Sequence, residues 1–162
     1  MSHFTCAVFT NARSGRALRA EIGKIMEPFG PDGSGKWEWY EADSRFASVL
    51  RLKAGGTAPA AVLADVDFSF DQTGASLAAA DWHEWKTAGS APFFMEDFFE
   101  RYPDAEAWAK SFGSFHVGAV VTPDGEWLDG ADAPLAWEQG GCAELVSSQD
   151  PSLYVSILNC RI

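Results

Sequence analysis

Apolar and polar residues alternate at both ends of the chain. His3–Thr10 is rich in β-forming residues and places Phe4, Cys6 and Val8 on one side, which predicts a strand. Leu153–Ile162 alternates strictly and predicts a second strand at the C-terminal end. If these two strands pair, His3 is expected to approach Cys160.

Helical spacing appears after the first strand and again in the middle of the chain. Asn11 or Ser14 can cap a helix whose apolar residues recur three or four positions apart, and the segment 28–35 (PFGPDGSG) ends it. Three further helices are expected in the middle of the chain. The first carries Leu77, Trp82 and Trp85 at helical spacing. The second is short, opens at 90–92 and carries Phe94, Phe98 and Phe99, and the third follows the capping residue Asp104 and carries Trp108 and Phe112.

The remaining patterns predict strands. Residues 37–53 favour two strands joined around 41–44, and residues 62–68 alternate. Residues 115–127 form a hairpin pattern around the turn Pro123-Asp124-Gly125. We therefore predict a single α+β domain over residues 1–162, with a mainly antiparallel sheet and helices packed on one face.

The composition and net charge of the chain indicate which kind of macromolecule it can bind. The chain has 162 residues, of which 47% are hydrophobic, and a formal net charge of −11. Residues 1–53 carry eight basic and six acidic side chains, whereas residues 54–162 carry four basic and 17 acidic side chains. This charge repels phosphate backbones, so no direct nucleic-acid binding is expected, and it attracts a basic protein surface. An acidic surface also simply keeps a domain rich in aromatic residues soluble.

Location follows from what the sequence lacks. No apolar run is long enough to span a bilayer, and the first 20 residues lack the apolar core of a signal peptide, so no membrane association is expected. Three cysteines, an odd number, fit a reducing cytoplasm better than a disulfide framework.

Motif searches favour a protein that is not an enzyme. No phosphate-binding glycine loop, nucleophile elbow or cysteine-pair metal motif is present, and no cofactor is predicted. Asp65 and Asp67 are expected on one strand face, where two carboxylates can hold Mg²⁺ or Ca²⁺ with His83 or Glu84 as a further ligand. The same carboxylates equally suit a solvated strand end.

One aromatic cluster offers a binding surface. Trp37 and Trp39 are expected to share a strand face, close to Tyr40 and Arg45. Strand-borne aromatics beside an arginine can stack a base or clamp a peptide, and they can also form the core. His3 or Asp65 is the candidate for proton transfer. His3 and the aromatic cluster together are the predicted ligand-binding or partner-binding residues.

Several short blocks resemble a family of small bacteriophage and prophage proteins of unassigned function that begin MSHFTVLV. The blocks are MSHFTCAVF (1–9), KWEWY (36–40), LRLK (50–53), ADVDF (64–68), VVTPDGEW (120–127) and the terminal NCRI (159–162), where the family often ends DCHI. Asn159 and Arg161 therefore replace an aspartate and a histidine of the family. The resemblance implies a protein made in the cytoplasm of a bacterial host.

Two functions from different classes follow. The first is a phage-type acidic protein that binds a bacterial host protein, such as an anti-defence protein acting on a basic groove, and inhibits or redirects it. The alternative is a nucleotide or small-molecule binding protein or hydrolase that uses Trp37, Trp39, Tyr40 and Arg45. A pocket that joins Arg45, His3 and an aspartate would favour the alternative. Self-association would instead indicate a homo-oligomer or a virion component.

Overall fold

The computed structural model describes residues 2–42, 50–90, 92 and 97–162. The chain divides into two compact units, of which the first comprises residues 1–68, 117–129 and 144–162, and the second comprises residues 69–116 and 130–143.

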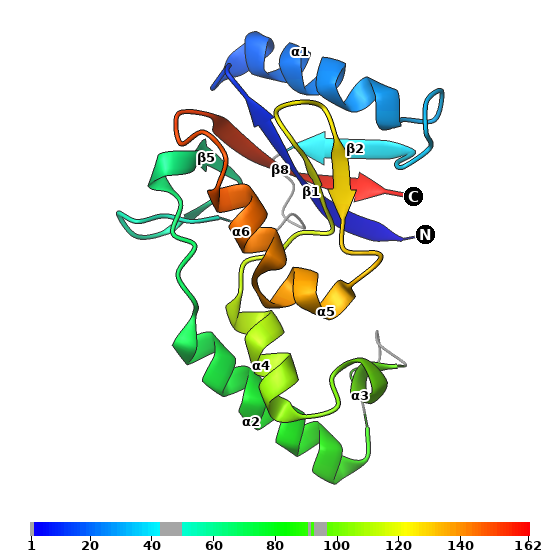
Figure 1. Ribbon diagram of the computed structural model, residues 1–162, viewed down its shortest axis with the longest axis vertical. Helices are drawn as coiled ribbons and strands as arrows, with labels where there is room; N and C mark the ends of the chain where they lie inside the picture. Colours follow the sequence, from blue (N-terminus) through cyan, green and yellow to red (C-terminus); the bar gives the residue numbers. More distant parts are fainter. Residues whose placement is uncertain (1, 43–49, 91, 93–96) are drawn as a thin grey trace. The chain divides into compact units, whose positions relative to one another are not determined.

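The first unit is built on one large sheet and contains every strand found among the described residues. They are β1 (His3–Thr10), β2 (Trp39–Ala42), β3 (Leu50–Arg51), β4 (Thr57–Ala58), β5 (Ala60–Val62), β6 (Ala119–Val121), β7 (Trp127–Asp129) and β8 (Tyr154–Arg161). The large sheet has the order β2-β8-β1-β6-β7, with β5 also paired to β8, and β3 pairs with β4 in a small sheet. In Figure 1 the N- and C-terminal strands run side by side.

The expected α+β class is confirmed, and the large sheet is mixed. β8 pairs antiparallel with β1, β2 and β5, and the β6–β7 hairpin is antiparallel as predicted. β1 and β6 are parallel, which the long chain segment between them permits. Gly125 has a φ of 83° in the hairpin turn, a conformation that glycine adopts without a steric penalty.

Helix α1 (Gly15–Met26) packs on one face of this sheet and is followed by the 3₁₀ turn η1 (Glu27–Phe29). Ile22 and Met26 of α1 join a buried cluster with side chains of β1, β6 and β8, namely Cys6, Val8, Ala119, Val121, Leu158 and Cys160. Residues between these on β1 and β8, such as Ala7 and Ile157, point to the opposite face and are also buried. Both faces of the central strands are therefore covered.

The second unit is helical. Its elements are α2 (Gln72–Ala88), α3 (Phe98–Arg101), α4 (Ala105–Gly113), α5 (Pro134–Ala136) and the kinked turn η3 (Trp137–Gly141), from which α6 (Cys142–Ser147) leads back into the first unit. Asp104 caps α4 as predicted, because its carboxylate accepts a hydrogen bond from the Ala107 N–H at 2.8 Å. Phe98, Tyr102 and Trp82 form the buried aromatic core of this unit.

The helical unit also contains a buried polar group. The Tyr102 hydroxyl donates to Glu138 Oε2 at 2.6 Å, and Arg101 forms an ion pair with the other oxygen of that carboxylate. Burial, followed by the hydrogen bond to Glu138, raises the pKa of Tyr102. The phenol is therefore protonated and acts as a donor throughout the neutral range.

One predicted strand is wrong in detail. Only Ala60–Val62 is a strand, and residues Leu63–Asp65 form the 3₁₀ turn η2, in which the Val66 N–H donates to the Leu63 carbonyl. Residues 62–68 thus contain a turn that buries Leu63 and Val66, three positions apart, rather than the continuous strand that the alternation predicts. The predicted positions Arg45 and Phe94 lie outside the described residues.

Candidate functional site

The predicted aromatic cluster divides between two faces of the sheet. Trp37 precedes β2, donates its indole N–H to the Met26 carbonyl at 3.1 Å, and meets Tyr40 edge to face at 5.0 Å between ring centroids. Both rings pack against the core cluster beneath α1. The expectation that Trp37 shares a strand face with Trp39 is wrong, because the strand begins only at Trp39 and its alternation does not extend back to residue 37.

Trp39 points away from that core. It is 47% exposed, and it pairs across β2 and β8 with Arg161. Tyr40 is its neighbour on β2 and belongs to the α1 face, so alternation places Trp39 on the opposite face. Trp39 is thus the one member of the aromatic cluster, within the described residues, that is exposed.

Two cross-strand rows form on this second face at the end of the sheet. His3, Arg161 and Trp39 make the first row, across β1, β8 and β2. Thr5, Asn159 and Glu41 make the next row. Directly opposed residues on one face have Cβ atoms about 4.5–5.5 Å apart, so these polar side chains are close neighbours.

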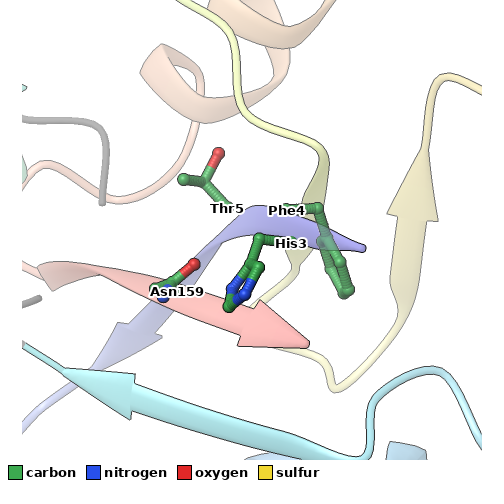
Figure 2. A pocket seen from close by; sticks show the side chains of 4 residues that line it. All are labelled: His3, Phe4, Thr5 and Asn159. Carbon is green, nitrogen blue, oxygen red and sulfur yellow. The ribbon is translucent and has the colours of Figure 1, made fainter. Parts of the chain in front are cut away.

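A pocket of about 440 Å³ opens at these rows. Among the described residues it is lined by His3, Phe4, Thr5 and Asn159. Figure 2 shows the imidazole of His3 and the hydroxyl of Thr5 on β1 and the amide of Asn159 on the adjoining strand β8. The volume falls within the range of small-molecule sites.

Asn159 is the most informative of the lining residues. It is 2% exposed, and it lines the pocket. An amide at the wall of a pocket is typical of a group that binds a ligand.

Arg161 adds positive charge beside the pocket. It is the direct partner of His3 on β8, and its Nε is buried without a hydrogen-bond partner. The half-buried Glu41 stands next to Asn159 on β2 and supplies a carboxylate on the same face. An imidazole, a guanidinium, an amide, a hydroxyl and a carboxylate are therefore gathered within two rows of one sheet face.

The sequence identified two of these residues, His3 and Trp39, and it missed Thr5, Asn159 and Glu41 as site residues. Arg161 was noted only as a departure from the phage family. The available signal was the strict alternation of residues 153–162, which puts Asn159 and Arg161 on one face of the last strand. Pairing of the end strands was anticipated, but its register was not.

The register also separates the cysteines from His3. His3 pairs with Arg161 rather than Cys160, and Cys160 lies with Cys6 in the core under α1, so the expected approach of His3 to Cys160 is wrong. The hydrogen bond with Cys160, followed by burial, raises the pKa of the Cys6 thiol well above its usual value. A protonated, buried thiol is a poor nucleophile, so Cys6 acts as a core residue.

The predicted metal pair is not assembled as expected. Asp65 ends the turn η2 and is exposed, whereas Asp67 follows Val66, and the Asp67 backbone N–H donates to the Arg51 carbonyl at 2.8 Å. The two carboxylates therefore do not share one strand face. Within the part of the chain that the structure describes, no group of three histidine, cysteine or acidic side chains is placed to hold a metal ion.

No family model, curated protein or solved structure matches this chain. The resemblance to the phage family therefore stays a prediction. Among the helices described, none has the length and apolar character that crossing a bilayer requires.

Proposed function

We propose that the protein binds a small anionic molecule, such as a phosphate- or carboxylate-bearing metabolite or a nucleotide, in the pocket at the end of β1 and β8. The single observation that carries the proposal is the buried Arg161 Nε, which has no hydrogen-bond partner and stands beside the pocket residue His3 in the sheet. This is the alternative that the sequence left open, moved from the face of Trp37 and Tyr40 to the opposite face of the same sheet.

The donors of the two rows outnumber their one carboxylate, Glu41, and therefore favour an anion. Arg161 offers a fixed positive charge whose Nε–H has no partner, and His3 and Thr5 offer further donors. The exposed indole of Trp39, in the row of Arg161 and His3, offers a surface on which an aromatic ring of the ligand can stack. An anion also needs such a local cluster, because the net charge of −11 repels it elsewhere.

The residues of the two rows support binding of a ligand rather than its chemical conversion. A nucleophilic mechanism needs a nucleophile and a base within hydrogen-bond reach, and the register puts the thiols of β1 and β8 on the face opposite His3. The residues of the two rows hold and orient a ligand by hydrogen bonds and charge.

The proposal is tested by thermal shift with a panel of inorganic phosphate, adenosine and guanosine nucleotides and citrate, followed by calorimetric titration of any compound that shifts the melting temperature. A compound at a hundredfold excess over its Kd should stabilise the protein by about 2.7 kcal/mol. Asn159→Asp keeps the side-chain shape but adds negative charge, and it should weaken binding at least about tenfold. Lys36→Gln removes an exposed charge of the same unit and serves as the matched control.

Two results would contradict the proposal. One is a panel in which no compound raises the melting temperature. The other is an Asn159→Asp variant that binds as tightly as the wild-type protein.

The function first suggested by the sequence, contact with a bacterial host protein in the cytoplasm, is the second candidate. It is favoured by the second unit, which carries ten acidic and only three basic side chains and exposes large apolar residues. Affinity capture from host lysate over a salt series tests it, because a complex indifferent to salt would remove the electrostatic part of the hypothesis.

A further inference from the structure

The helical unit exposes three large apolar side chains near the start of α2 and the end of α4. Phe70, Leu77 and Phe112 are 46%, 65% and 52% exposed. Large apolar side chains scattered singly are ordinary on protein surfaces, whereas a group of them marks an interaction site. We refer to these three residues as the α2–α4 patch.

Backbone contacts bring the members of the patch together. The Asp71 N–H donates to the Gly113 carbonyl at 2.9 Å, which joins the start of α2 to the end of α4. The ring of Phe112 lies against Gly74, where a Cβ would sit 3.3 Å from ring atom Cε1, and Leu77 follows Gly74 by three residues on the same side of α2.

Phe70 is held in the same way. Its ring covers Gly113, where a Cβ would lie only 2.7 Å from the ring. Phe112 is also supported from beneath by Trp108, whose ring centroid is 5.6 Å away. The two phenylalanine rings are thus fixed in place while about half of each side chain is exposed, which reduces the entropy lost on binding.

Acidic side chains border the patch. Asp81 and Glu84 are exposed on α2, four and seven residues after Leu77, and therefore continue the same side of the helix. No described basic residue forms an ion pair with either carboxylate.

The three basic side chains of this unit are engaged elsewhere. Arg101 pairs with Glu138, Lys110 pairs with Glu106 at 3.3 Å, and Lys86 lies 4.7 Å from the Phe99 ring centroid. The negative charge beside the patch is therefore not balanced from within the unit.

We infer that the α2–α4 patch is a docking site for a partner protein segment that presents apolar side chains flanked by lysine or arginine. The apolar side chains would cover Phe70, Leu77 and Phe112, and the basic residues would face Asp81 and Glu84. Charge selects this occupant, because a second copy of the chain would bring a like-charged surface, and a nucleic acid would bring phosphates. The inference is independent of the pocket on the sheet.

The test uses a labelled synthetic amphipathic helix of leucine and lysine, with two comparison peptides in which serine replaces leucine or glutamate replaces lysine. Fluorescence anisotropy should show that the wild-type protein binds the leucine–lysine peptide at least about tenfold more tightly than either comparison peptide, and that salt weakens the binding. Leu77→Ser and Phe112→Ser should each weaken binding of the leucine–lysine peptide about tenfold.

Ile162→Ser is the matched control, because Ile162 is 55% exposed and lies in the other unit, and it should bind like the wild type. Leu77→Ser keeps the test valid if Phe112→Ser disturbs the contact with Trp108. Equal binding by Leu77→Ser and wild type, or by the leucine–glutamate peptide, would overturn the inference. So would a wild-type dimer in light scattering that Leu77→Ser converts to a monomer, because the occupant would then be a second copy.

Discussion

Replacement of Asn159 by leucine should make the protein more stable while it abolishes ligand binding. Leucine has the same number and branching of side-chain heavy atoms as asparagine, fits a strand better, and replaces a polar amide that is 2% exposed. Removing a polar amide from water costs about 1–3 kcal/mol, a cost that leucine avoids. For a chain of this length each kcal/mol corresponds to a rise of about 2–4 °C in melting temperature.

Urea unfolding followed by tryptophan fluorescence and far-UV circular dichroism measures the change in the free energy of unfolding. Asn11→Leu is the matched control, since Asn11 is exposed, and its effect should stay within about 0.5 kcal/mol. A gain in stability together with a loss of ligand binding is expected when a buried polar group is kept for function. The reasoning is refuted if Asn159→Leu unfolds more easily than the wild type, because the amide would then stabilise the fold itself.

Three further predictions concern the structural framework. Tyr102→Phe should lower the free energy of unfolding by about 1.5–3 kcal/mol at neutral pH, because it removes the hydrogen bond to the Glu138 carboxylate. The pKa of Tyr102 is raised in the fold, so this contribution is complete below the pKa of an unfolded tyrosine and is lost as the pH rises through the folded value; urea midpoints of the two proteins should therefore converge in strong alkali. Asp104→Ala should cost about 1 kcal/mol in urea unfolding through the lost cap of α4, whereas Glu106→Ala should cost less, because its pair with Lys110 is exposed. The free thiols of Cys6, Cys142 and Cys160 are buried and should react with a thiol-specific reagent only when urea unfolds the protein; rapid reaction in native buffer would contradict the assigned burial.

Local signals were sufficient for much of the fold. The boundaries of β1, the cap of α4 and the hairpin around Gly125 follow from residues that interact within a few positions of one another. The alternation of residues 62–68 misled because a 3₁₀ turn buries residues three positions apart, here Leu63 and Val66, which a strand would place on opposite faces. Periodicity records which residues are buried, and it does not record which backbone geometry buries them.

The site depended on information that no local pattern contains. Its two rows form because β8 pairs with β1 on one side and β2 on the other, in one register, over a sequence separation of more than a hundred residues. A shift of one residue in either pairing would exchange the faces and place Cys160 beside His3. The sequence could therefore suggest His3 and Trp39 separately, but it could not indicate that Arg161 stands between them.

The strongest reason to regard the rows as functional is that the side chains on one face of the sheet change from apolar to polar toward its end. On β8 this face carries the buried apolar residues Val155 and Ile157 and then turns to Asn159 and Arg161. On β1 it carries Phe9 and Ala7 and then turns to Thr5 and His3. If this end of the sheet were only solvated, its polar side chains would be exposed, yet Asn159 is as buried as the apolar residues before it. Because burying a guanidinium nitrogen without a partner lowers stability, the Arg161 Nε beside this pocket is best explained by a ligand that supplies the missing hydrogen bond.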